Sequence, residues 1–145
     1  MYIVVKYGII RYMKDIAKSR HSTYFLSYHI VWIPKYRRRF LTEELRQQAE
    51  VILRNIVFEK EWNLHTIDVQ SSHIHLSVSA APTIAPAEIV KALKGISARR
   101  LLMKYPDLAE KSGRGTLWAP SYFVATSGGV SFDTIQRYIE DCQDH

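Results

Sequence analysis

Hydrophobic and polar positions repeat with two periods along this chain, and their order predicts its secondary structure. Period-two alternation, or a run of aromatic and β-branched residues, indicates a strand, whereas apolar residues three and four positions apart indicate a helix. We expect strands at residues 22–33, 64–70, 73–79 and 120–127. We expect helices at residues 43–60, from Pro86 to near Pro106, and at 132–142.

This order of elements, β-α-β-β-α-β followed by a last helix, is α+β. It predicts a ferredoxin-like (RRM-like) four-stranded antiparallel sheet with two helices on one face and the other face left for ligands or a partner. Local signals support the helices: Thr42 is the expected N-cap of the first. Pro86 suits the first turn of the second helix, and Ser131 can cap the last.

The strand HIHLSVS at residues 73–79 separates its side chains sharply by face. Its apolar residues Ile74, Leu76 and Val78 share one face and are expected in the core. His73 and His75 share the opposite, polar face, where two imidazoles can converge on one small ligand. The alternative is a solvated outer face that happens to carry histidine. Since the helices must cover the apolar face, we expect both imidazoles on the open side of the sheet.

Composition narrows the class of partner. The chain has 145 residues, enough for one domain, and 20 Lys and Arg against 14 Asp and Glu, for a net charge of +6. This excess favours a polyanionic partner, nucleic acid first. The single cysteine, Cys142, excludes an intramolecular disulfide, so a cytoplasmic location is expected. Residues 1–14 are apolar but interrupted by charges, which predicts neither a signal peptide nor a membrane span.

Two imidazoles are a partial site for Mn²⁺, Mg²⁺ or Zn²⁺. Tyr138 lies at the edge of the apolar stripe of the last helix, so it is either a core residue with a wet hydroxyl or a nucleophile that forms a covalent intermediate. A phenol that attacks a phosphodiester needs the phosphate charge neutralised, which a divalent ion does. Together with the basic charge, these residues indicate the breaking and rejoining of a nucleic-acid strand.

Four segments in a fixed order carry a resemblance to a known family. They are SYHIVWIPKYRRRFL (27–41), HIHLSV (73–78), VKALKGISARRLLMKYP (90–106) and LWAPSYFVATSGGVSFDTIQRYIE (117–140). Through them the chain resembles the single-tyrosine HUH transposases (TnpA type) of small insertion sequences that move as single-stranded DNA. The resemblance runs from about Ser19 to Gln143 and implies a transposase domain at 19–145 after an N-terminal extension, 1–18.

The resemblance implies roles for three of these residues. His73 and His75 would bind a divalent metal, Mg²⁺ or Mn²⁺, and Tyr138 would attack the scissile phosphate to give a 5′-phosphotyrosine and a free 3′-hydroxyl. The partners implied are single-stranded DNA with hairpin ends and a second copy of the chain. In such a homodimer, the tyrosine helix of one subunit serves the histidines of the other.

The chain departs from the family pattern at two places. The family completes its metal site with a glutamine four residues after the tyrosine, where this chain has Cys142, so the third ligand stays open among Gln143, Cys142, Asp141 and water. Ser71 and Ser72 replace the family's Pro-Asp and remove a carboxylate near the site. Two alternatives therefore remain: a domesticated relative that acts on repetitive hairpin DNA, and a non-catalytic nucleic-acid-binding module of the same fold.

The remaining candidates are basic or aromatic. The expected contacts to the DNA backbone, with a solvated surface as the alternative, are Lys35, Arg37, Arg38, Arg39, Lys91 and Lys94. His29 and His65 are interpreted as packing or surface histidines rather than ligands. Packing is also the interpretation for the larger aromatic residues Trp32, Trp62, Trp118 and Tyr122.

Overall fold

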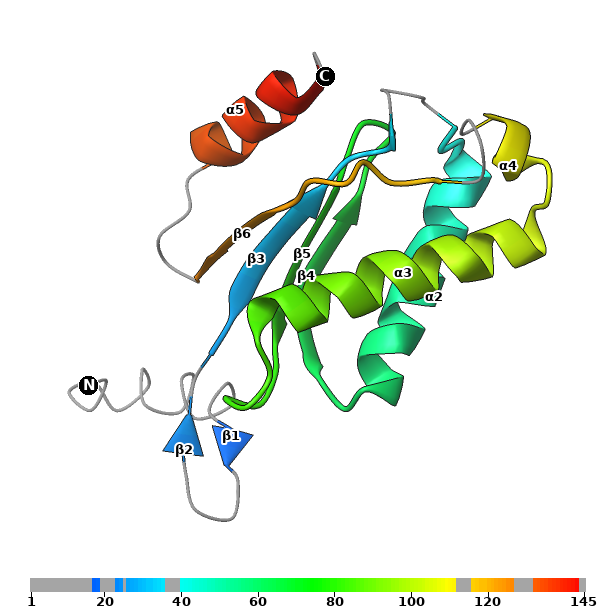
Figure 1. Ribbon diagram of the computed structural model, residues 1–145. Helices are drawn as coiled ribbons and strands as arrows, with labels where there is room; N and C mark the ends of the chain where they lie inside the picture. Colours follow the sequence, from blue (N-terminus) through cyan, green and yellow to red (C-terminus); the bar gives the residue numbers. More distant parts are fainter. Residues whose placement is uncertain are drawn as a thin grey trace.

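A four-stranded antiparallel sheet with the order β4-β5-β3-β6 forms the centre of the molecule (Figure 1). The computed structural model describes residues 17–18, 23–24, 26–35, 40–111, 116–126 and 132–143, with the side chains of 17–18, 23–24, 132, 142 and 143 left out. The strands are β3 (Tyr28–Trp32), β4 (Asn63–Val69), β5 (Ile74–Ser79) and β6 (Phe123–Thr126). This is the strand order of a ferredoxin-like sheet, and it confirms the predicted fold class.

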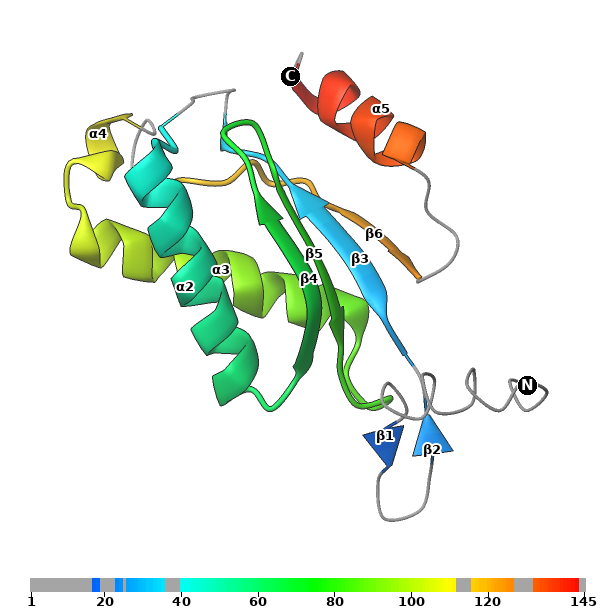
Figure 2. The ribbon, with the colours of Figure 1, turned by 180° about the vertical axis from the view of Figure 1, so that it is seen from behind.

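Helices lie on both faces of this sheet. The helices α2 (Glu43–Glu59) and α3 (Pro86–Lys104) cover one face, and α5 (Phe132–Gln143) lies over the other (Figures 1 and 2). No helix within the described ranges combines the length and the apolar character needed to cross a membrane.

Two small features were not predicted. The helix α4 (Leu108–Lys111) follows α3, and the strands β1 (Ala17–Lys18) and β2 (Thr23–Tyr24) form a separate two-stranded sheet. The single long strand expected at 22–33 is therefore wrong. Its first part pairs with β1 as β2, and only residues 28–32 join the central sheet.

The helix signals in the sequence correspond to real contacts. The side-chain oxygen of Thr42 accepts a hydrogen bond from the backbone N–H of Leu45 (3.4 Å), as expected of an N-cap. Pro86 lies in the first turn of α3, as predicted. Both helices send an apolar face into one core, to which they contribute the buried residues Leu45, Ala49, Ile52, Leu53, Ile56, Ile89, Val90, Leu93 and Leu101.

The tryptophans belong to the core, as predicted. Trp32 is fully buried, and its ring meets that of Trp118 edge-on with 6.0 Å between centroids. The indole N–H of Trp118 donates to the hydroxyl of buried Ser97 (3.1 Å), so its one polar atom is satisfied. Trp62 is also buried. Tyr122 differs from the prediction: it precedes β6 and is 39% exposed, with the Lys94 ammonium 5.9 Å from its ring centroid.

The sheet face opposite α2 and α3 is not left open along its whole width. Val31 of β3 is fully buried there, because Ile135 and Ile139 of α5 pack against it. Phe123 and Tyr138 are partly buried beside this small cluster. Apolar side chains on β3 and β6 give the last helix a place to dock. Farther along the same face, over β5 and β4, the side chains are polar, and among them His75 is half-buried and Asp68 exposed.

Lys94 of α3 connects the helix layer to the segment that leads into β6. Its ammonium group donates to the carbonyl oxygens of Ala119 (2.6 Å) and Ser121 (3.1 Å), and burial lowers its pKa. Lys91, one turn earlier, is exposed. The two lysines predicted to act alike therefore occupy different environments, and Lys94 holds the backbone before β6.

Replacing Lys94 by methionine keeps the aliphatic stem and removes both hydrogen bonds to these carbonyl oxygens. We expect the free energy of unfolding to fall by about 1–3 kcal/mol, because hydrogen bonds from a charged donor are lost. The matched control is Lys91→Met on the exposed side of the same helix, which should change stability by less than about 0.5 kcal/mol. Urea denaturation of the three proteins checks this, and equal losses for both variants would contradict it.

Candidate functional site

The two faces of β5 separate as the sequence predicted. Ile74, Leu76 and Val78 are fully buried against the helices. His75 lies on β5 and His73 directly before it, and both side chains are half-buried. In the sheet register His75 stands between Asp68 of β4 and Val31 of β3. The imidazoles therefore lie on the face that α5 only partly covers.

Both histidines line a hollow of about 580 Å³ between the sheet and α5. His29 and Asp68 line it as well, together with residues 70–72 of the turn between β4 and β5. The side chains that α5 contributes are Ile135, Gln136 and Ile139. The result is a cavity with imidazole nitrogens and polar oxygens on the sheet side and a largely apolar wall on the helix side.

Each imidazole has one nitrogen in a hydrogen bond. Nδ1 of His73 lies 3.0 Å from the hydroxyl oxygen of Ser72. Nε2 of His75 lies 3.1 Å from Nδ1 of His29, with 5.4 Å between the two ring centroids. These partners restrict the rotation of both rings, which is how proteins orient histidines that bind metal ions.

The surroundings favour the neutral form of both rings. Burial lowers the pKa of His73, and nearby Asp68 opposes this only in part. Burial also lowers the pKa of His75, and repulsion from the positive forms of His29 and His73 adds to the effect. A neutral imidazole has the free electron pair that a metal ion needs, so this shift favours the form of both rings that can act as a ligand.

Asp68 supplies a carboxylate to the hollow that the sequence pattern did not predict. The replacement of the family's Pro-Asp by Ser71 and Ser72 removes one carboxylate near the site, but another is present: Asp68 pairs with His75 across the two strands and lines the same hollow. Its Oδ1 accepts a hydrogen bond from the side-chain amide of Gln70 (2.7 Å). The carboxylate comes from the neighbouring strand because the register of β4 on β5 places it there.

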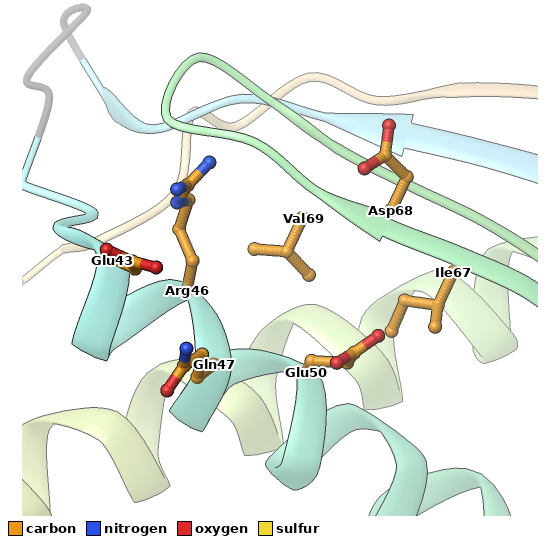
Figure 3. A pocket seen from close by; sticks show the side chains of 7 residues that line it. All are labelled: Glu43, Arg46, Gln47, Glu50, Ile67, Asp68 and Val69. Carbon is orange, nitrogen blue, oxygen red and sulfur yellow. The ribbon is translucent and has the colours of Figure 1, made fainter.

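A second hollow, of about 210 Å³, lies on the other side of β4, against α2. Figure 3 shows Ile67 and Val69 pointing from β4 toward α2, whereas Asp68 points away from the helix. The α2 side is formed by Glu43, Arg46, Gln47 and Glu50. Its charges are of both signs, with Arg46 and Glu50 half-buried and Glu43 and Asp68 exposed, and its lining does not select one kind of ligand.

The donor set around His73 and His75 fits a divalent ion with mixed nitrogen and oxygen ligands. Two neutral imidazoles lie beside a carboxylate, an amide and hydroxyl groups, which are the ligand types of Mn²⁺, Mg²⁺ and Zn²⁺. Among the described residues, no three His, Cys, Asp or Glu side chains converge closely enough to hold an ion by themselves. Two imidazoles completed by other oxygens are the arrangement that fits.

Tyr138 also belongs to α5, but it lies on a different side of this helix from the residues that line the hollow. Its hydroxyl is 3.3 Å from that of Ser121, and its ring packs at 5.7 Å from the ring of Phe123. It is half-buried at the margin of the apolar stripe, as predicted, and it does not line the hollow. The structure therefore does not bring Tyr138 to His73 and His75 of its own chain.

The other predicted site residues are placed only in part. Asp141 is exposed on α5 and does not line the hollow. The backbone of Cys142 and Gln143 belongs to α5, but their side chains lie outside the described residues.

Among the basic candidates, Lys35 is half-buried in the segment that follows β3, and Lys91 is exposed on α3. Arg37, Arg38 and Arg39 lie outside the described residues. None of the described basic candidates lines the hollow.

His29 lies at the candidate site, which differs from its interpretation from the sequence. It was interpreted as a packing or surface histidine, yet it is in the hollow and in contact with His75. A signal was present in the sequence, since His29 alternates with Ile30 and Trp32, which are core residues. Alternation gives the face of His29 but not the strand beside it, and so its neighbour could not be inferred.

Comparison with known proteins identifies the family. Residues 22–142 match the family described as "Transposase IS200 like". The ISDra2 transposase TnpA of Deinococcus radiodurans is 41% identical over 130 residues, which span 90% of this chain and 93% of the relative. The transposase for insertion sequence element IS200 of Salmonella typhimurium is 30% identical over 128 residues, 88% of this chain and 84% of the relative.

Solved structures agree with this assignment. A crystal structure described as that of a transposase from Deinococcus radiodurans has a TM-score of 0.80 and 38% identity, and covers 88% of this chain and 97% of its own. A REP-associated tyrosine transposase bound to a REP hairpin has a TM-score of 0.52 and 11% identity over 85% of this chain and 69% of its own, a likeness of fold. On the match over residues 22–142 and the identity with ISDra2 TnpA, this chain belongs to the family of IS200-like transposases.

Proposed function

We propose that this transposase cleaves and rejoins single-stranded DNA through a covalent link between Tyr138 and a 5′-phosphate. The observation that carries the proposal is the hollow beside α5, in which two half-buried imidazoles held neutral by their surroundings share one face. His73 and His75 would hold Mg²⁺ or Mn²⁺ there. When bound, such an ion would offset the negative charge on the oxygens of the scissile phosphate.

In the cleavage step the phenol oxygen of Tyr138 attacks phosphorus and loses its proton. The bond from phosphorus to the 3′-oxygen breaks, and that oxygen takes up a proton to become a free 3′-hydroxyl. Joining is the reverse: a 3′-hydroxyl attacks the phosphotyrosine and releases the phenol. The phosphotyrosine keeps the energy of the original phosphodiester, so neither step needs ATP.

We propose further that the working unit is a homodimer with shared sites. In one chain, α5 turns Ile135, Gln136 and Ile139 toward the histidines, while the hydroxyl of Tyr138 lies beside Ser121. This arrangement supports a division of labour in which Tyr138 of one subunit serves the hollow of the other. The contact between the hydroxyls of Tyr138 and Ser121 is exposed, so in this proposal the transfer of Tyr138 to a partner would not require the core to unfold.

The DNA proposed is a single strand with hairpins at the ends of the element. The REP-associated tyrosine transposase of the same fold is bound to a REP hairpin, which supports this substrate class by analogy. We propose Lys35, Lys91 and the basic segment 37–39 as contacts to the DNA backbone, since phosphate contacts give charge-based affinity without reading sequence. Lys94 remains a proposed contact, although its ammonium also holds Ala119 and Ser121.

Replacing Tyr138 by phenylalanine removes the attacking oxygen and leaves the aromatic packing against Phe123 in place. With labelled single-stranded hairpin DNA and Mn²⁺, we expect a DNA adduct that resists SDS for the wild type and none for the variant, because no covalent bond can form. Binding of the uncleaved DNA should be unchanged. An absence of adduct with every hairpin tested, while both proteins bind equally, would favour the non-catalytic binding module.

Mixing two inactive variants tests the shared site. In a heterodimer of Tyr138→Phe with His73→Ala/His75→Ala, one hollow is intact and the tyrosine of the other subunit is intact. If sites are shared, these two parts meet and the mixture forms adduct, whereas each variant alone does not. The gel should show the adduct on the subunit with altered histidines. A mixture as inactive as its components would show instead that each chain uses its own tyrosine.

The lowered pKa of His73 and His75 predicts a loss of stability in acid. Above their unfolded pKa of about 6.5 both rings are neutral in the folded and unfolded states. Below it, the unfolded chain takes up protons that the folded chain resists, so the free energy of unfolding falls. Urea denaturation of metal-free protein between about pH 7.5 and 5 should show this fall, and the fall should be smaller in His73→Asn/His75→Asn. Identical pH profiles would contradict the assignment.

A further inference from the structure

We infer that His29 is a positioning residue for the proposed metal site. It accepts a hydrogen bond from Nε2 of His75 and thereby leaves Nδ1 of His75 as the nitrogen that binds the ion. This inference rests on the proposed function, because it assigns a role at the site that His73 and His75 form. It goes beyond that function by adding a residue from another strand and by stating which nitrogen of His75 is used.

The sheet register brings the two rings together. His29 pairs with Ser77 and Val31 pairs with His75, so His29 and His75 are diagonal neighbours on the same face of β3 and β5. Diagonal side chains of antiparallel strands are within reach of each other when they are long or aromatic. Nδ1 of His29 lies 3.1 Å from Nε2 of His75, a normal distance for a hydrogen bond between nitrogens.

Two neutral imidazoles joined in this way share a single proton between the facing nitrogens. If Nε2 of His75 carries the proton, its Nδ1 has a free electron pair and can bind a cation. If His29 donates instead, the proton of neutral His75 is on Nδ1, which blocks that nitrogen. The state that can bind metal therefore requires His29 to be the acceptor, with its own proton on Nε2. In histidines that bind a metal ion, the hydrogen bond made by the other ring nitrogen commonly fixes the tautomer.

His73 shows the same pattern with a different partner. Its Nδ1 is engaged by the hydroxyl of Ser72 at 3.0 Å, which leaves Nε2 for a ligand. Each proposed ligand thus has one nitrogen held by a neighbour and one nitrogen without a hydrogen bond among the described residues. His29 thus holds one nitrogen of His75 in the way that Ser72 holds one nitrogen of His73, which supports the role of His29 as a hydrogen-bond partner of a metal ligand.

A role for His29 as a third ligand agrees less well with the geometry. No group of three His, Cys, Asp or Glu side chains within the described part of the chain converges on a common point. Nδ1 of His29 is already in a hydrogen bond with His75. The structure thus assigns His29 as a hydrogen-bond partner of the ligand His75 rather than as a ligand itself.

The test measures Mn²⁺ affinity of the full chain by calorimetry. We expect His29→Ala to weaken binding about 10- to 100-fold, the usual effect of losing such a partner. His29→Asn should retain most of the affinity, because its Oδ1 stands where Nδ1 of histidine was and can accept the same bond. The matched control is His65→Ala: this exposed histidine on β4 bonds Ser79, outside the hollow, and its loss should leave affinity unchanged.

A second measurement does not depend on any variant being folded. Nitrogen NMR of the metal-free wild type should show His29 as the neutral tautomer with its proton on Nε2. Nitrogen hyperfine spectra of the Mn²⁺ complex of the wild type should report two imidazole ligands. Three imidazoles in the wild type would overturn the inference by making His29 a ligand, and so would a proton on Nδ1 of His29.

The outcomes separate this inference from the proposed function. If the wild type and His65→Ala bind Mn²⁺ and form adduct, and folded His29→Ala binds equally well, the positioning role fails and the function stands. If the wild type neither binds Mn²⁺ nor forms adduct, the proposed function fails. If nitrogen NMR shows the proton of His29 on Nδ1, the positioning role is wrong, whether or not the adduct forms.

Discussion

The antiparallel pairing of β3 with β5 is the constraint on which the rest of the structure depends. It sets Ile30 opposite Leu76 in the core and Val31 opposite His75 on the other face. A slip of one residue would exchange the two faces and bury the imidazoles among hydrocarbon. The same backbone pairing therefore aligns the core residues and positions the histidines. His29 reaches His75 only because the buried side chains fix this register.

The face that carries the site must satisfy two opposed requirements. Its β5 and β4 side offers imidazoles and a carboxylate, which need partial access to water and ligands. Its β3 and β6 side offers Val31 and Phe123, which need cover, and α5 supplies it with Ile135 and Ile139. The hollow lies along the boundary between these two halves. A helix that covered the whole face would close the site, and one that covered none would leave hydrocarbon exposed.

Local periodicity was enough to predict the fold class, the core and the sharing of one face by His73 and His75, because alternation within a strand requires no knowledge of its neighbours. What it could not predict depends on contacts between distant segments. His29 and His75 are 46 positions apart, and Lys94 reaches a carbonyl 25 positions away. Asp68 likewise comes beside His75 through the pairing of β4 with β5, which local periodicity does not give. The docking of α5 on its own sheet was missed because an apolar stripe does not say which surface it will meet.

The helix α5 is attached to the sheet by a small apolar cluster. Burial of an aliphatic side chain stabilises by about 1.5–3 kcal/mol, so Ile135 and Ile139 together give about 3–6 kcal/mol. An isolated helix of 12 residues is marginal in water, so this small cluster is what holds it. The helices α2 and α3 share the much larger core and are tied to global unfolding. Elements held by few buried contacts open locally well before the fold does. The proposed nucleophile thus stands on a helix held to the sheet by a small apolar cluster, while the imidazoles it must meet stand on the sheet itself.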